Sequence, residues 1–466
     1  MLFFICQCVF AQVAINTTGN SPALSAMLEV SSPNKGLLIP RMTSAQRKAI
    51  TSPDTGLLVF DTDRQTIYFF DGQKWKPMMV ATEETAPLAS RQVQGARWNA
   101  QFGYAADLFE NRAAIGAPAD SAKGTIGGAV YLFEKNSGHW EQSVKLSAPL
   151  PQAGEGFGKA VALNDDYLVV GAPDKTVSGN VKRGAVYLFK RFNRVWNYLT
   201  TLAASNGAAS DYFGTAVSIS NGYIAIGAPH RNHNGKTNAG SVYIFGLQSG
   251  NWVQKAVINA SDPYTDATFG AALDLDGNRL AVGAPAAEAF ANNVSGNGGA
   301  VYTFTNTDPA GLTWTSGQKL TPGGYTHSTM KFGCSLALEG TKLLIGAPGY
   351  SGSPGIDYPM EVGTIFWYDQ INGKWDYKSH VLQYNEDHQL GTSVALSNGT
   401  MLAGMPGSIG GNGKVVILTS PYRHVYDADP HLKYGFGTAI AAHNGQFLVT
   451  KPKDPFGRVF FGLVEE

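Results

Sequence analysis

The sequence predicts an all-β protein, a seven-bladed β-propeller preceded by a small β-rich N-terminal module. Three observations predict this fold class. A unit with constant internal spacing occurs seven times, each unit contains short strand-like segments, and no stretch of the repeated region keeps the 3.6-residue period of a helix. Four strands per unit and seven units are typical of a propeller, in which each blade packs its faces against two neighbours.

Each unit begins with a Phe-Gly dipeptide, which Leu390-Gly391 replaces in the sixth unit. The aromatic residues are Phe102, Phe157, Phe213, Phe269, Phe332 and Phe436. We expect this Phe to pack between blades, and we expect the following Gly to let adjacent backbones approach closely.

A second marker follows 14 residues after each Phe or Leu and reads Gly-Ala-Pro in the first five units. Units six and seven are degenerate there, but the proline is present in all seven: Pro118, Pro173, Pro229, Pro285, Pro348, Pro406 and Pro452. Because proline cannot donate a ladder hydrogen bond, we expect it to end the second strand.

A third marker, Gly-Ala-Val-Tyr or a variant of it, lies at a variable distance beyond the proline. In the first five units a tryptophan follows this marker, at Trp140, Trp196, Trp252, Trp314 and Trp375. The seventh unit ends without such a strand. We therefore predict that a segment between Trp75 and Trp98 supplies the missing outer strand and closes the ring.

These three markers resemble the FG-GAP repeat, the blade unit of the integrin alpha-subunit propeller and of many bacterial secreted proteins. The resemblance covers residues 102–466 and implies a seven-bladed propeller. Calcium-binding integrin blades carry a longer acidic loop between the first two markers, which this sequence lacks. Asp274 and Asp276 form only part of such a loop, and hard cations need six to eight oxygen ligands. We expect no cofactor, and calcium is disfavoured.

The sequence pattern of residues 13–85 differs from that of the repeated region. Strand-like segments occur at residues 26–30, 36–40, 56–60 and 66–70, and Thr43 to Gln46 reads as the capping box of a short helix. This region is similar to an N-terminal module of Bacteroidetes-type secreted proteins and tail-fibre-like proteins. The resemblance implies a surface stalk or attachment module that forms homo-oligomers.

The apolar run of residues 1–11 fits a secretory signal peptide, with Val9 and Ala11 at the small-residue positions. The fit is imperfect because no Lys or Arg precedes the run, and the alternative is a frayed hydrophobic N-terminus. If residues 1–11 are removed, Cys334 is left as the one cysteine and no internal disulfide can form. We expect a secreted or cell-surface protein.

The resulting division of the chain has four parts: a signal peptide at 1–11, the β-rich module at 12–85, a linker with the expected closing strand at 86–101, and the propeller at 102–466.

Composition narrows the possible partners. Gly accounts for 55 of 466 residues, and only 15% of the residues are charged, against about 25% in average proteins. Lys plus Arg and Asp plus Glu both number 35, so the formal net charge is zero. A neutral chain has no general attraction for nucleic acid or anionic membranes. We expect neither nucleic acid as a partner nor a membrane span.

Catalytic signatures such as HExxH, a Walker loop or G-x-S-x-G do not occur. His230 and His233 form an H-x-x-H, but a third ligand is missing nearby, and solvated loop histidines are the simpler interpretation.

Loop length points to a ligand-binding face. The distance from the second marker glycine to the third varies between units, whereas the first hairpin keeps its length. Loops carried on a rigid scaffold usually hold function. Candidate ligand-binding residues in these loops are Asp120, Asp174, Lys175, His230, Arg231, His233, Tyr350, Asp357 and Tyr358.

Three functions remain open. The first is a non-catalytic binding or adhesion protein that recognises an extracellular protein or glycan. The second is an extracellular polysaccharide-acting enzyme with its site over the central channel, and the third is a structural fibre-tip component. Clustered carboxylates at the channel would favour the enzyme, whereas a channel lined by small and aliphatic side chains would favour binding.

Overall fold

A computed structural model describes residues 13–16, 21, 26–63, 66–77, 89–92, 99–121, 124–291, 294–296, 298–308, 310–322, 330–350, 363–382, 389–407, 413–419, 422–427, 435–452 and 458–463. The chain forms two compact units, Met1–Pro87 and Leu88–Glu466. The prediction of an all-β propeller preceded by a β-rich module is confirmed. The described residues contain one short helix, and none of their helices is long and apolar enough to cross a bilayer.

The N-terminal unit contains two small sheets. In the first, β1 (Val13–Ile15) pairs in parallel with β2 (Leu28–Val30). The second has the order β3 (Arg41–Met42), β4 (Leu58–Asp61), β5 (Thr66–Phe70) and β6 (Trp75–Pro77).

Helix α1 (Ser44–Lys48) lies between β3 and β4 and begins with the predicted capping box. The Thr43 side chain accepts from the Gln46 backbone, and the Gln46 side chain accepts from the Thr43 N–H. The predicted strand at 36–40 is wrong, because this segment is irregular and belongs to no sheet of the described residues, although the Phe60 N–H of β4 donates to the Pro40 carbonyl at 2.8 Å. Pro40 ends it and cannot donate a ladder bond.

The second unit contains seven four-stranded antiparallel sheets in its described residues. Blades 1 to 3 comprise β8 (Ala106–Phe109), β9 (Arg112–Ala117), β10 (Ala129–Asn136) and β11 (His139–Leu146); β12 (Ala160–Leu163), β13 (Tyr167–Ala172), β14 (Ala185–Phe192) and β15 (Val195–Leu202); and β16 (Val217–Ser220), β17 (Tyr223–Ala228), β18 (Ser241–Gln248) and β19 (Asn251–Ile258).

Blades 4 to 6 follow the same order, and blade 4 carries an inserted hairpin between its second and third strands. They comprise β20 (Ala272–Asp276), β21 (Arg279–Ala284), the hairpin β22 (Ala289–Ala291) and β23 (Val294–Gly296), β24 (Ala300–Asn306) and β25 (Trp314–Leu320); β26 (Ser335–Glu339), β27 (Lys342–Ala347), β28 (Thr364–Ile371) and β29 (Lys374–Leu382); and β30 (Ser393–Ser397), β31 (Thr400–Met405), β32 (Lys414–Thr419) and β33 (Tyr422–Asp427).

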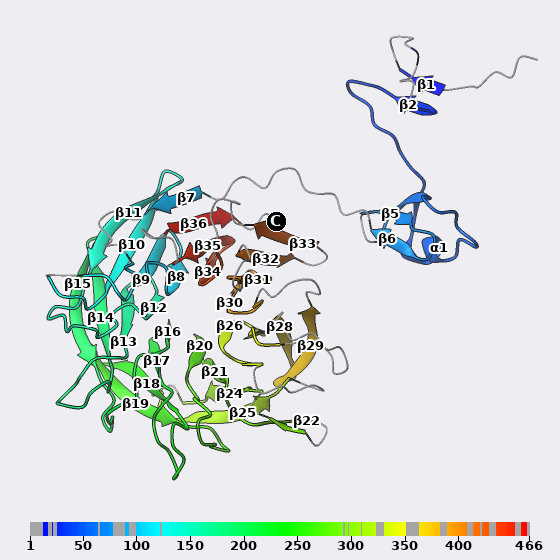
Figure 1. The fold of residues 1–466 in the computed structure, drawn as a ribbon. Coiled ribbons are helices and arrows are strands. Elements are labelled where there is room, and N and C mark those ends of the chain that lie inside the picture. The colour runs from blue at the N-terminus through cyan, green and yellow to red at the C-terminus, as the bar shows by residue number, and fades with distance from the viewer. Residues whose placement is uncertain are drawn as a thin grey trace, which may run out of the picture. The chain divides into compact units, whose positions relative to one another are not determined.

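The seventh blade joins the two ends of the propeller unit. Strands β34 (Ile440–His443), β35 (Gln446–Lys451) and β36 (Arg458–Leu463) are completed by β7 (Ala89–Gln92), which pairs with β36 in antiparallel register. Strand β7 lies within the interval from which the sequence predicted a closing strand. The seven sheets surround a centre lined by their first strands, and β34 lies beside β8 (Figure 1).

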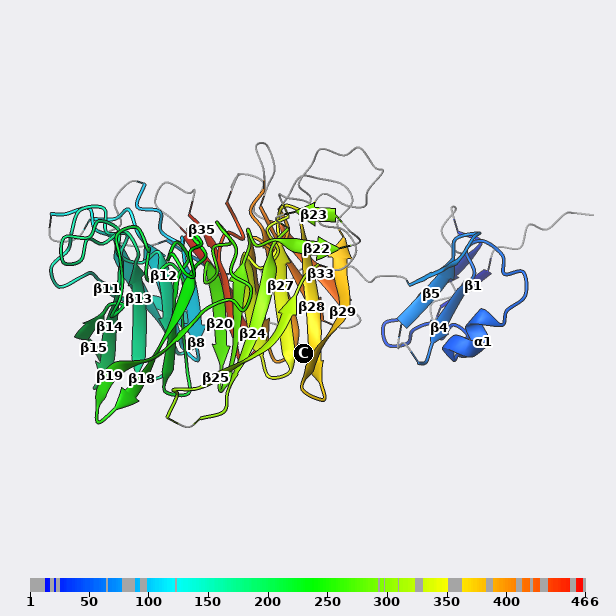
Figure 2. The ribbon, with the colours of Figure 1, turned by 90° about the horizontal axis from the view of Figure 1, so that it is seen from below.

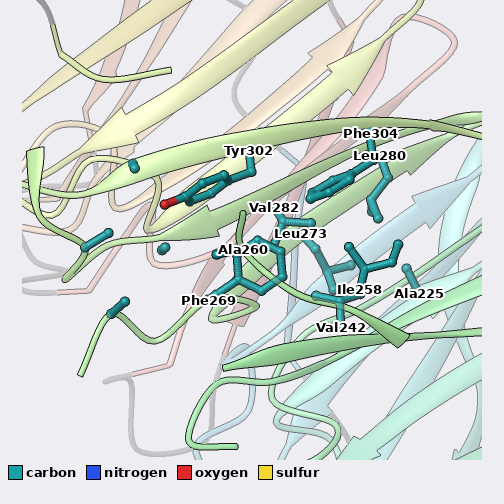
Figure 3. Close-up of a cluster of buried hydrophobic side chains, with 14 of the residues drawn as sticks. Ala225, Val242, Ile258, Ala260, Phe269, Leu273, Leu280, Val282, Tyr302 and Phe304 are labelled. Atoms are coloured by element: carbon teal, nitrogen blue, oxygen red, sulfur yellow. The ribbon is translucent and has the colours of Figure 1, made fainter. Parts of the chain in front are cut away.

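The repeated Phe packs between blades, as predicted. Phe269 is fully buried between Val242 of blade 3 and Tyr302 and Phe304 of blade 4 (Figure 3). Its ring meets Tyr302 edge-on, with centroids 5.4 Å apart. The seam between blades 3 and 4 is therefore a sheet-on-sheet contact with an aromatic residue at its centre, whereas Leu390 takes that place between blades 5 and 6.

The repeated glycines bring the backbones of neighbouring blades together. A Cβ at Gly227 of blade 3 would overlap the carbonyl oxygen of Gly270 in blade 4, and five other seams have the same arrangement. At the closing seam Thr450 replaces the glycine, and its hydroxyl donates to the Gly103 carbonyl at 2.7 Å. The one exception in the glycine pattern therefore makes a hydrogen bond across the ring closure.

Candidate functional site

The two ends of the ring differ in structure. At one end lie the tight turns between the first and second strands of each blade and the connections between the third and fourth strands of blades 1 to 6. At the other end lie the loops from the second to the third strand, including the β22–β23 insertion (Figure 2). We call these ends the hairpin face and the loop face. The seven predicted ligand-binding residues that the structure describes belong to loops of the loop face.

In blade 1, Asp120 is a structural residue and is not exposed. Its side chain is fully buried, the Tyr131 hydroxyl donates to it, and Lys145 Nζ lies 3.0 Å from its carboxylate. Burial and the neighbouring carboxylate raise the pKa of Tyr131. Asp120 therefore holds the loop against the third and fourth strands and cannot reach a ligand in this arrangement.

In blade 2 the two predicted residues, Asp174 and Lys175, also form ion pairs that hold the loop in place. Lys175 Nζ lies 2.8 Å from Glu155, which also accepts from the Tyr187 hydroxyl at 2.8 Å. Asp174 pairs with Lys159 at 2.5 Å. Both residues thus anchor the loop to the connection that enters blade 2.

In blade 3, Arg231 lies 3.3 Å from Asp211, and His230 packs edge-on against Tyr212 at 4.8 Å. His233 sits at the loop tip, where its backbone pairs with Lys236. Across the described chain, no three His, Cys, Asp or Glu side chains lie close enough to hold a metal ion.

Blade 5 has an aromatic cluster at the corresponding place. Tyr350 is buried, and its ring lies 6.4 Å from that of Phe366 and 6.3 Å from that of His380. The remaining predicted residues, Asp357 and Tyr358, lie outside the described residues.

Sequence reasoning missed the tyrosine of the third marker, whose hydroxyl donates to the second-to-third-strand loop in blade 1 and to the connection that enters the blade in blades 2 to 4. In blade 4 the Tyr302 hydroxyl donates to Asp262 at 2.7 Å, and Lys319 pairs with Asp262 at 2.6 Å. Although burial alone would raise it, the hydrogen bonds from Lys319 and Tyr302 hold the pKa of Asp262 below its ordinary value. The sequence contained a signal for this residue, because tyrosine occupies the position in blades 1 to 4 and phenylalanine replaces it in blade 5.

The loop tips remain exposed where the anchors end. In blades 2 and 3 each tip is a tight turn, closed by a bridge from Val177 to Asn180 and by one from His233 to Lys236. Val181 is 57% exposed, and Lys182 and Lys236 are exposed beside these turns. Anchored bases with exposed tips provide a preorganised surface for recognition.

The first strands of the seven blades line a central cavity of ≈ 410 Å³. Its lining is mainly Ala, Val, Leu and Ser, with carboxylates at Asp107, Asp274, Asp276 and Glu339. Burial raises the pKa of Asp107 to about 7 and that of Asp274 to about 6, and the charge of Asp274 adds to the shift of Asp107.

These carboxylates connect neighbouring blades. Asp107 accepts the backbone N–H of Leu163 at 2.6 Å, and Asp274 accepts that of Leu338 at 2.8 Å. Each first strand is the edge of its sheet, so its inward N–H groups lack a ladder partner. An acidic side chain one blade earlier satisfies such a group.

Toward the hairpin face the same arrangement continues two residues further along the strands. Asp276 accepts from Gly340 N–H at 2.7 Å, Ser397 accepts from Gly445 N–H at 2.9 Å, and Glu339 accepts from two N–H groups of blade 6. These bonds constrain the hairpin face. On the loop face, the loop of blade 3 bonds to the connection that enters blade 4, where the Asn238 side chain donates to Asp266 at 2.7 Å and the Asp266 N–H donates to the Thr237 carbonyl at 2.8 Å.

Comparison with family models agrees with this structure. Residues 140–189, 196–245 and 252–304 match the FG-GAP repeat, and residues 14–89 match a phage tail-like trimerisation region. The chain thus contains FG-GAP repeats and a tail-fibre-like N-terminal module.

Proposed function

We propose that this protein is a non-catalytic binding protein, secreted or displayed at the cell surface, that uses its loop face to recognise an extracellular protein or glycan. The observation that carries the proposal is the contrast between the two faces. The hairpin face consists of short turns joined by hydrogen bonds between blades, whereas the loop face presents loops of varying length with anchored bases and exposed tips.

The N-terminal match indicates oligomer formation. Several propellers in one particle would bind a repetitive surface together, so that modest affinity at each loop face becomes high avidity. This arrangement suits adhesion to a glycan or to a protein array better than it suits capture of a soluble molecule.

The experiment is a glycan and extracellular-protein array probed with the full chain and with two charge-reversal variants. Lys182→Glu with Lys236→Glu changes the loop tips of blades 2 and 3, and Arg194→Glu changes the hairpin face of blade 2 as the matched control. We expect the loop-face variant to lose at least about tenfold in affinity for any ligand found, which is about 1.4 kcal/mol. Equal binding by all three proteins would contradict recognition by these loops.

A specific observation favours a second function, an enzyme acting at the central cavity. Two carboxylates there, Asp107 and Asp274, have raised pKa values, as acid and base groups of active sites often do. Burial accounts for these raised pKa values, and the backbone N–H groups that donate to the two carboxylates give the carboxylates a structural role without catalysis. Turnover of a polysaccharide by the native protein, lost in Asp274→Asn, would support the enzyme and contradict the non-catalytic proposal.

A further inference from the structure

The N-terminal unit exposes an apolar face on its first sheet. In the parallel pair of β1 and β2, Val13 lies opposite Leu28 and Ile15 lies opposite Val30. Because side chains alternate along a strand, these four residues share one face, whereas Ala14 and Glu29 share the other. The exposed fractions are 47% for Val13, 58% for Ile15, 56% for Leu28 and 39% for Val30.

A two-stranded sheet with an uncovered apolar face is not stable by itself in water. The rest of this unit offers little cover, because Val59 is the one hydrophobic side chain buried among its described residues. Leu37 and Leu38, in the irregular segment after β2, are also exposed, at 66% and 83%. The unit thus presents most of its large aliphatic side chains outward, which indicates that other polypeptide covers them.

We propose that this face, Val13, Ile15, Leu28 and Val30, packs against the same face of two other copies of the chain. Three β1–β2 pairs would then enclose one apolar core around a threefold axis, with Leu37 and Leu38 at its border. The inference rests on the oligomer in the proposed function and assigns its seam.

Two observations select copies of this chain as the occupant. The match to a trimerisation region spans residues 14–89 and so includes β2 and most of β1. The face is also uncharged and self-complementary, because all four of its side chains are aliphatic and the one charged residue of the pair, Glu29, lies on the opposite face. A closed threefold arrangement buries such a face in every copy without leaving an open end.

The first test measures the mass of the full chain in solution by light scattering. One chain has a mass of 49.6 kDa, and we expect the native protein to have three times this mass. Ile15→Lys with Val30→Lys should reduce it to one chain, because lysines would lie in the apolar core. Glu29→Lys, which changes a neighbouring position on the other face, should remain trimeric. The thermal transition of the propeller should be equal in all three proteins.

A second measurement separates a seam from general unfolding of the module. Ile15→Cys is labelled with pyrene in a chain whose Cys6, Cys8 and Cys334 are replaced by serine. We expect excimer emission from the three labels around the axis, and none from Glu29→Cys treated in the same way.

The outcomes separate the two proposals. A native trimer that keeps its mass with both lysines and gives no excimer would overturn the seam while leaving the oligomer intact. A native protein with the mass of one chain would overturn both the seam and the oligomer. Loss of the trimer in the double lysine variant, together with excimer emission from the label at position 15 and none from the label at position 29, would support the seam. This result does not depend on which ligand the loop face binds.

Discussion

The two units of the chain bury opposite kinds of side chain. In the propeller, aliphatic and aromatic residues fill the seams between blades. In the N-terminal unit, the buried polar pair Arg47 and Asp61, 2.9 Å apart, lies beneath Tyr68, and aliphatic side chains face outward. The propeller completes its own core within one chain, whereas the N-terminal unit needs further copies to do so.

Deleting the closing strand should have the largest effect. Removal of residues 1–100 takes β7 away and exposes the edge of β36, so we expect a fall in melting temperature of about 10 °C or more. Removal of residues 1–87 alone retains β7 and should leave the transition within about 2 °C of the native value. Calorimetry of both truncations measures this, and an unchanged transition after the longer deletion would contradict the role of β7.

Glycine substitutions should distinguish the two units at single positions. Gly227→Ala forces a Cβ into the Gly270 carbonyl across a packed seam, so we expect a loss of about 3 kcal/mol in the free energy of unfolding. In the N-terminal unit, Gly36→Ala has no heavy atom within 4 Å of the added Cβ and should change stability by less than about 0.5 kcal/mol. Denaturant titration of both variants provides the comparison, and similar losses would contradict the close approach between blades.

The smallest expected effect concerns the central cavity. The pKa of Asp107 is about 7 in the folded protein, above the ordinary value of 3.8, so the folded state binds the proton more tightly than the unfolded chain. This group therefore stabilises the fold at low pH, and its contribution declines as the pH rises from about 4 to about 7.

Asp107→Asn removes that titration. We expect the difference in melting temperature of the propeller between pH 5 and pH 8 to shrink by about 2 °C, or about 1 kcal/mol in a domain of this size. Asp165→Asn, at an exposed turn of the hairpin face, serves as the control. An identical pH profile in Asp107→Asn and the native protein would contradict the raised pKa.

The fold was predictable because it repeats. A spacing of 14 residues between markers recurs in every unit, and strands end one residue before each marker proline, as at Ala228 before Pro229. In the N-terminal unit only the capping box and the strands near 28, 58 and 66 were predictable. The irregular segment at 36–40 shows why, since a short apolar run becomes a strand only where a partner lies beside it.

The candidate site was less predictable than the fold. Loop length correctly indicated a face with irregular loops, but several named residues are anchors and are not exposed. Asp120 is buried because Tyr131 and Lys145 approach it from two later strands. Such triads combine residues from a loop and from two strands, and one sequence without a fold gives no sign that they meet.

The sequence by itself determined the blade, because glycine, proline and aromatic residues act locally, through strand ends, turns and close backbone approach. Tertiary structure alone decided which charges are buried, which carboxylates join neighbouring first strands, and which apolar residues of the N-terminal unit stay exposed. These properties depend on groups far apart in the chain. Thr450 illustrates both levels: it breaks the local glycine pattern, and only ring closure brings its hydroxyl to the carbonyl of Gly103.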